Sequence, residues 1–115
     1  MDDLRKLVPG HYYHLYNRGN NREDIFPGPE NYPYFLQLWL KHIHPIAETF
    51  VYALMKNHFH ALVFIRPLFD LLLLPAMTVK ANDPDPLSHK LPRRFSDLFN
   101  AYAKAINKRY SRTGS

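Results

Sequence analysis

The sequence contains no cysteine, which excludes disulfide scaffolds and thiolate metal sites and is compatible with a reducing cytoplasm. Long hydrophobic runs are also absent, because the longest apolar block, near LLLLPAM, is far too short to cross a bilayer. The first ten residues, MDDLRKLVPG, carry charges with no apolar segment behind them, so they do not read as a secretory signal. We therefore expect a cytoplasmic protein with no membrane partner.

Acidic residues are scarce relative to basic ones, 10 against 15, which gives a formal net charge of +5 and a pI near 9.6. A basic balance favours a polyanion such as nucleic acid, although many basic proteins bind none. Aromatic residues make up 15% of the chain, and aromatic rings among cations are typical of proteins that hold unpaired bases. The length of 115 residues predicts a single domain spanning 1–115.

Hydrophobic periodicity predicts five main elements in the order βαββα. The strands are HYYHLYNRG (11–19), ETFVYALMKN (48–57) and HFHALVFIR (58–66), with Lys56 and Asn57 at a tight turn. The helices are NYPYFLQLWLKHIHP (31–45), with Asn31 as its cap and Pro45 as its stop, and RRFSDLFNAYAKAINKRYSR (93–112). The interval 67–92, between the third strand and the second helix, is predicted to be a long mobile loop with room for one short helical turn at FDLLLL (69–74).

This order indicates the α+β class, with a ferredoxin-like (RRM-like) antiparallel sheet and two helices on one face. A complete ferredoxin-like unit is βαββαβ, so the last strand is missing from the predicted order. Without that strand, one edge of the sheet is exposed or is covered by another chain. We therefore interpret the chain as a domain that is incomplete at its C-terminal end or that pairs with a partner.

The histidines His58 and His60 stand one residue apart in the third strand, so both side chains point to one face of the sheet. Leu62 and Phe64 share that face and the other face is apolar too, which predicts a central strand covered on both sides. The spacing leaves two interpretations open: histidines bonded to backbone or water, or a site for one divalent cation. His14, on the first strand, is a further metal-site candidate.

Three sequence blocks carry a resemblance to a known family: HLYNRGNNREDIF, YALMKNHFHALV and AYAKAINKRYSRTGS. Their order and approximate spacing resemble the REP-associated tyrosine transposases, relatives of the single-tyrosine HUH insertion-sequence transposases. The HUH motif is His, a bulky hydrophobe, His, which His58-Phe59-His60 matches. The resemblance covers residues 11–115, and it is the combination of the three blocks that makes it specific.

The resemblance implies DNA transposition by metal-dependent cleavage of single-stranded DNA and strand transfer through a 5′-phosphotyrosine. It implies that His58 and His60 hold Mg²⁺ or Mn²⁺, that hairpin or single-stranded DNA is the partner, and that a homodimer can form. The nucleophilic tyrosine of that family lies beyond the block matching 101–115, so we expect it, a third metal ligand and the closing strand beyond Ser115. This chain would then be inactive by itself. Tyr102 could stand in as the nucleophile, but its place on the apolar stripe of the last helix favours core packing.

The predicted DNA-binding surface combines the segment NRGNNR with the basic side of the last helix. Arginine reaches phosphates and asparagine reaches base edges, while Lys104 and Lys108 share a helix face with Arg112 one turn further on. A polar turn and a solvated helix face are the alternatives. The candidate residues are Asn17, Arg18, Asn20, Asn21, Arg22, Lys104, Lys108, Arg109 and Arg112.

Two other functions remain compatible with the sequence. One is a non-catalytic RRM-like nucleic-acid-binding module, which would use exposed aromatic residues and need no metal. The other is a metal-dependent phosphoesterase acting on small molecules, which would turn over without DNA and show little salt-dependent DNA binding.

Overall fold

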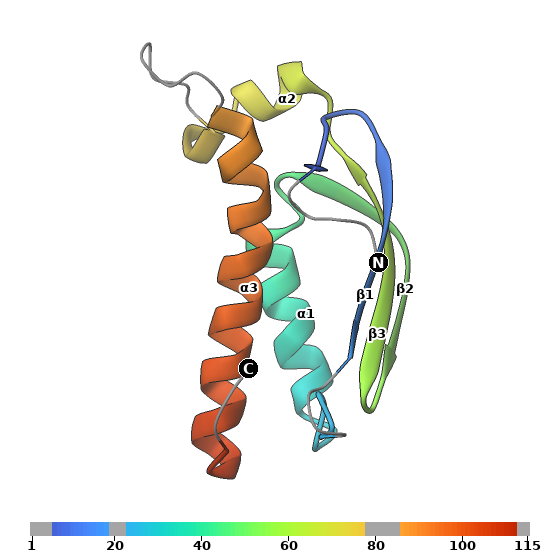
Figure 1. Cartoon of the computed structure of the whole chain (residues 1–115), viewed down its shortest axis with the longest axis vertical. Helices are drawn as coiled ribbons and strands as arrows, with labels where there is room; N and C mark the ends of the chain where they lie inside the picture. Colours follow the sequence, from blue (N-terminus) through green and yellow to red (C-terminus); the bar gives the residue numbers. More distant parts are fainter. Residues whose placement is uncertain (1–5, 19–22, 78–85, 113–115) are drawn as a thin grey trace.

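The computed structural model describes residues 6–18, 23–77 and 86–112. Three strands form one antiparallel sheet in the order β1-β3-β2, and the two long helices α1 and α3 lie side by side against one face of it (Figure 1). This arrangement confirms the predicted α+β class and the predicted order of the main elements. In chain order the elements are β1 (Tyr12–Arg18), α1 (Asn31–His42), β2 (Ala47–Met55), β3 (His58–Ile65), α2 (Leu68–Leu72), the 3₁₀ helix η3 (Pro75–Met77) and α3 (Pro86–Tyr110).

Strand β3 is central because it pairs with both of the other strands. It follows β2 through the two-residue turn at Lys56 and Asn57, the position that the sequence predicts. On its other side the register pairs Tyr16 of β1 with His60 and Arg18 with His58. A register shift between Thr49 and Val51 interrupts the regular pairing of β2 with β3.

The hydrophobic core lies between the sheet and the two long helices. Every second residue of β3, beginning at Phe59, is buried, as expected for a strand with one face against a core. The apolar residues of both helices meet this face: Phe35 and Trp39 from α1, Ile43 directly after it, and Phe95, Leu98, Tyr102 and Ile106 from α3 are all buried. Among the described residues, no helix is both long enough and apolar enough to span a membrane.

The start of α1 differs from the prediction that Asn31 caps it. Glu30 occupies the N-cap position and makes no side-chain cap hydrogen bond, while Asn31 is the first helical residue. The Asn31 side chain is buried, and its Oδ1 accepts hydrogen bonds from the Gly28 amide at 2.7 Å and the Tyr110 hydroxyl at 3.1 Å. Asn31 therefore ties the loop before α1 to the end of α3, which the local sequence could not indicate.

The interval 67–92, predicted as a loop with room for one short helical turn at FDLLLL, is more helical than that where the structure describes it. Helix α2 and η3 occupy its first part, and α3 already begins at Pro86. Leu71, Met77 and Leu91 are almost completely buried, so these short pieces close one end of the core. The helix continues through Pro92 although proline has no amide hydrogen to donate, with the buried Leu91 on one side of it and the buried Phe95 on the other.

Candidate functional site

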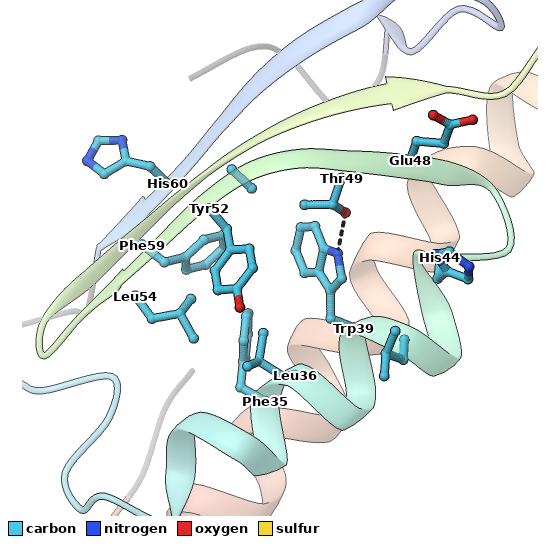
Figure 2. Close-up of a pocket in the computed structure, with 12 residues that line it drawn as sticks. Phe35, Leu36, Trp39, His44, Glu48, Thr49, Tyr52, Leu54, Phe59 and His60 are labelled. Atoms are coloured by element: carbon cyan, nitrogen blue, oxygen red, sulfur yellow. Dashed lines mark hydrogen bonds between the residues drawn. The ribbon is translucent and has the colours of Figure 1, made fainter.

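The side chains of His58 and His60 lie on the same face of β3, the face turned away from the helices. Both residues are half-buried, whereas Phe59 between them is buried in the core. Their ring centroids are 5.2 Å apart and the rings are nearly perpendicular. Figure 2 shows the His60 imidazole pointing away from the helix α1, on the opposite side of the sheet from Phe35 and Trp39.

The prediction that β3 is covered on both faces is wrong for the described part of the chain. Leu62 and, on β2, Val51 and Met55 keep 36%, 63% and 50% of their surface exposed. The reason is that α1 and α3 both pack on one side of the sheet, so the described elements leave the other side open (Figure 1). The two histidines therefore stand on an accessible surface instead of inside a core, and we call this surface the open face.

Each of the two imidazoles uses its Nδ1 atom in a hydrogen bond. The His58 Nδ1 lies 2.8 Å from Asn57 Oδ1, and the His60 Nδ1 lies 3.2 Å from His14 Nε2. Desolvation lowers the pKa of His60, and the neighbouring His58 and His14 lower it further because a second positive charge nearby is unfavourable. The shift favours the neutral form of His60, which is the form that binds a metal ion.

The pair can supply two ligands to a cation, but not a complete protein cage. Among the residues that the structure describes, no group of three or more His, Cys, Asp or Glu side chains could hold a metal ion. Further ligands would have to include oxygens from water or from a bound phosphate, which Mg²⁺ and Mn²⁺ prefer. The donor set therefore fits an open, substrate-contacting site better than a structural one.

Two residues of β1 join the histidines on the open face. The Tyr16 ring centroid is 4.8 Å from that of His60 and 5.8 Å from that of His58. Arg18, the last residue of β1, is exposed and is the register partner of His58, which by strand parity places it beside the histidines; it also borders the cavity on the helical side described below. The sequence suggested Arg18 for DNA binding, but the pairing register that brings Arg18 and Tyr16 to the histidines is not visible in it.

An aromatic cluster lies further along the same face. The Tyr12 ring centroid is 4.7 Å from that of Phe64 and 5.6 Å from that of Phe50, so one ring from each strand takes part. Tyr12 is 60% exposed and Phe50 is 52% exposed. Exposed rings on an antiparallel sheet are the usual platform for stacking unpaired bases.

Those of the predicted DNA-binding residues that the structure describes lie in more than one part of the fold. Lys104 and Lys108 are exposed on α3, in the helical layer on the far side of the sheet from the histidines (Figure 1). Arg109 forms an ion pair with Glu30 at 2.8 Å in the same layer. Asn20, Asn21 and Arg22 lie outside the described residues.

A polar cavity of about 430 Å³ lies between the end of β1 and α3, and Asn17, Arg18 and Arg112 contribute to its walls. Arg112 donates a hydrogen bond to the Asp24 carbonyl at 2.8 Å and also approaches Glu23 at 3.8 Å. Three of the predicted residues thus meet here, but Arg112 already has protein partners that hold the segment before α1.

Tyr102 lies on the helical side of the sheet. It is 6% exposed, its hydroxyl donates to the Ile25 carbonyl at 2.6 Å, and its ring packs edge-on against Phe35 at 5.1 Å. Burial raises its pKa above the ordinary tyrosine value, which disfavours the phenolate that a nucleophile requires. The surroundings of Tyr102 are those of a core residue.

A second cavity, of about 490 Å³, opens between α1 and β2 (Figure 2). Its walls are mainly aromatic and aliphatic, including Phe35, Tyr52 and Leu54. The Trp39 indole donates to the Thr49 hydroxyl at 2.8 Å at its edge. The lining also includes the polar residues His44 and Glu48, and His60 borders the cavity from β3.

Compared with protein-family models, curated proteins and solved structures, the chain matches none of them.

Proposed function

We propose that this chain is a DNA-binding domain of the HUH transposase type, acting in DNA transposition on single-stranded or hairpin DNA. The observation that carries the proposal is the placement of His58 and His60 together on the open face, where a phosphate can reach them. The three sequence blocks that resemble the REP-associated tyrosine transposases support the same assignment.

The hydrogen bonds of the pair favour metal binding. Asn57 Oδ1 can only accept, so His58 carries its proton on Nδ1 and has an Nε2 lone pair to offer. The lowered pKa of His60 keeps it neutral near pH 7. When bound here, Mg²⁺ or Mn²⁺ would reduce the negative charge on a DNA phosphate and help to orient it.

The surroundings of the pair suit a single nucleic-acid strand. Arg18 can donate to a phosphate oxygen next to the histidines, and the Tyr16 ring can stack on the neighbouring base. The rings of Tyr12 and Phe64 would receive a base further along the strand. The net charge of +5 favours this partner throughout.

Strand cleavage also needs a nucleophile, and the burial of Tyr102 argues against that residue. We propose that this chain alone binds DNA without cutting it. Incubation of a labelled hairpin oligonucleotide with the protein and Mn²⁺ tests this, and cleavage would contradict it. A covalent adduct mapped to Tyr16 would identify the tyrosine beside the histidines as the nucleophile instead.

The metal site is tested by replacing both histidines, His58→Ala and His60→Ala, and measuring free Mn²⁺ by electron paramagnetic resonance. We expect binding to be lost, because two imidazole ligands are removed from an open site. The control is a double variant at His11 and His44, which are exposed and outside the pair. This variant should bind Mn²⁺ as the unchanged protein does. Equal Mn²⁺ binding by the two double variants would rule the proposed metal site out.

A non-catalytic RRM-like module is the second candidate, and the aromatic cluster of Tyr12, Phe50 and Phe64 favours it. In that case DNA or RNA binds the open face without a metal. The same double histidine variant separates the two functions, since the module predicts nearly unchanged nucleic-acid affinity and no dependence of that affinity on Mn²⁺.

A further inference from the structure

We propose that His14 is a positioning residue for His60. In this proposal His14 accepts a hydrogen bond from the Nδ1–H group of His60 and so fixes the tautomer that leaves the Nε2 lone pair of His60 available to a cation. The inference rests on the proposed function, because it assigns the orientation of one ligand of the same site.

The two rings have the geometry of an in-plane hydrogen bond. The His14 Nε2 and the His60 Nδ1 are 3.2 Å apart, while the ring centroids are 5.3 Å apart and the ring planes are within 15° of parallel. That centroid separation is close to the largest that a 3.2 Å nitrogen contact allows between two imidazoles. The two nitrogen atoms therefore lie between the ring centres, and the nearly parallel rings face each other through their nitrogen-bearing edges. The N–H bond and the lone pair of an imidazole lie in the ring plane, so they point at each other here.

One proton can occupy this contact, and its position decides what His60 can bind. If His14 donates, neutral His60 carries its proton on Nε2 and has no lone pair there for a metal. If His60 donates from Nδ1, its Nε2 lone pair is available. A cation at Nε2 withdraws electron density from the ring and makes the Nδ1–H group a better donor, so metal binding and this hydrogen bond favour each other.

The neighbouring histidine follows the same pattern with a different acceptor. Asn57 Oδ1 lies 2.8 Å from the Nδ1 of His58, and an amide oxygen can only accept. His58 and His60 would then both offer Nε2. Two hydrogen bonds, one from the turn before β3 and one from the adjacent strand β1, would set both ligands in matching tautomers before any cation arrives.

The same contact argues against His14 as a third metal ligand. Its Nε2 atom is directed at His60, and the described residues contain no group of three candidate ligands that could hold a metal ion. His14 is exposed, so replacing it leaves the core intact. A change of metal affinity in a His14 variant therefore does not require a change of fold.

The test begins with metal-free protein at about pH 8, where histidine is neutral. Long-range ¹H–¹⁵N nuclear magnetic resonance assigns the protonated nitrogen of each ring. We expect His58 and His60 to carry the proton on Nδ1 in the unchanged protein. In His14→Phe, which keeps a ring but removes the acceptor, His60 should shift toward a mixture of tautomers while His58 is unaffected.

Mn²⁺ affinity is then measured for the same proteins. We expect His14→Phe to weaken binding about tenfold, the usual loss when the hydrogen-bond partner of a metal-binding histidine is removed. His14→Gln should restore most of the affinity, since its amide oxygen can accept from His60 Nδ1. His11→Phe, a matched change of an exposed histidine on the same segment, should change neither the tautomer of His60 nor the affinity.

Two results would overturn the role of His14: a proton on Nε2 of His60 in the unchanged protein, or equal Mn²⁺ affinity in the His14→Phe and unchanged proteins. Neither result contradicts the proposed function if the double variant His58→Ala/His60→Ala fails to bind Mn²⁺. Conversely, if that double variant binds Mn²⁺ normally, the metal site fails and the tautomers measured without metal remain a separate result.

Discussion

At the scale of single residues, Tyr16 and Tyr102 show how position sets the chemistry of one side-chain type. Tyr16 stands beside two imidazoles on the open face, where a ligand can reach it. Tyr102 is enclosed by Phe26 and Phe35, and its hydroxyl is committed to the Ile25 carbonyl. Burial raises the pKa of Tyr102, so its role is to hold the segment before α1 against α3.

The hydroxyl of Tyr102 gives a prediction at this scale. Tyr102→Phe should lower the free energy of unfolding by about 1 kcal/mol, because it removes one buried hydrogen bond and leaves the Ile25 carbonyl without that donor. Urea denaturation measures the loss, and Tyr52→Phe, at an exposed position, serves as the control. Mn²⁺ binding should be unchanged, and its loss in Tyr102→Phe would indicate that this tyrosine belongs to the site after all.

At the scale of elements, the contact between α1 and α3 is fixed by Arg94 as well as by apolar packing. The Arg94 guanidinium donates to the carbonyls of His42 at 2.8 Å and Lys41 at 2.9 Å. These carbonyls belong to the last turn of α1, where the helix itself provides no amide partner. Arg94 therefore caps one helix from another, and it also places a positive charge beside the His42 ring.

Removing this cap should destabilise the fold. Arg94→Ala should lower the free energy of unfolding by about 1.5–3 kcal/mol, the range for hydrogen bonds that involve a charged group. The matched control is Arg93→Ala, an exposed neighbour on the same helix, which should stay within about 0.5 kcal/mol of the unchanged protein. Equal effects of the two changes in chemical denaturation would contradict the capping role.

The same contact predicts a pH dependence of stability. The pKa of His42 lies below its ordinary value of 6.5, first because of desolvation and then because of Arg94 and Lys41; Asp97 opposes this shift. The unfolded chain therefore binds a proton more readily than the folded one between pH 6.5 and the lowered pKa. The contribution of neutral His42 to the stability of the folded protein is therefore complete above pH 6.5. It is lost as the pH falls from 6.5 through the lowered pKa.

Denaturation at a series of pH values measures this loss. His42→Gln should flatten the acid side of the profile, while His44→Gln, an exposed neighbour, should not. The His60 pKa is also lowered, so part of the slope should survive in His42→Gln. An unchanged profile in His42→Gln would show that His42 does not titrate differently in the folded state.

At the scale of the whole molecule, the two sides of the sheet have different surfaces. The long helices lie on one side of the sheet, over the core (Figure 1). The other side carries His58, His60 and exposed aromatic rings, with Arg18 at the end of β1. Lys104 and Lys108 belong to the helical layer. A nucleic-acid strand lying along the open face would therefore contact the stacking rings and Arg18. Lys104 and Lys108 would lie on the other side of the sheet, away from it.

Binding of an unstructured DNA oligonucleotide tests this division. Tyr12→Ala should cost about 1–3 kcal/mol of binding free energy, the usual value for one base-stacking ring. Arg18→Ala should reduce the slope of log affinity against log salt by about 1, because one phosphate contact is lost. Fluorescence anisotropy at several salt concentrations measures both quantities.

The control for this experiment is Lys104→Ala combined with Lys108→Ala. These residues lie in the helical layer, so binding to the open face should weaken little when they are removed. A large loss in this variant together with normal binding by Tyr12→Ala would place the nucleic acid on the helices and contradict the open-face site.

The sequence alone determined the features that follow from the geometry of a single segment. A strand repeats every two residues, so His58 and His60 had to share a face, and helical spacing put Phe35 and Trp39 on one stripe. The turn at Lys56 and Asn57 was visible for the same reason. In each case the residues that matter are neighbours in the chain.

Only the tertiary structure decided which face of the sheet is open and what stands beside the histidines. The placement of both long helices on one side leaves Leu62 exposed, and the register of β1 against β3 brings His14 and Tyr16 to His60. These outcomes depend on pairing and packing between segments far apart in the chain. A local periodicity shows which residues of a strand share one face. It contains no information on how that strand is aligned with another strand, or on which face of the sheet a helix will cover.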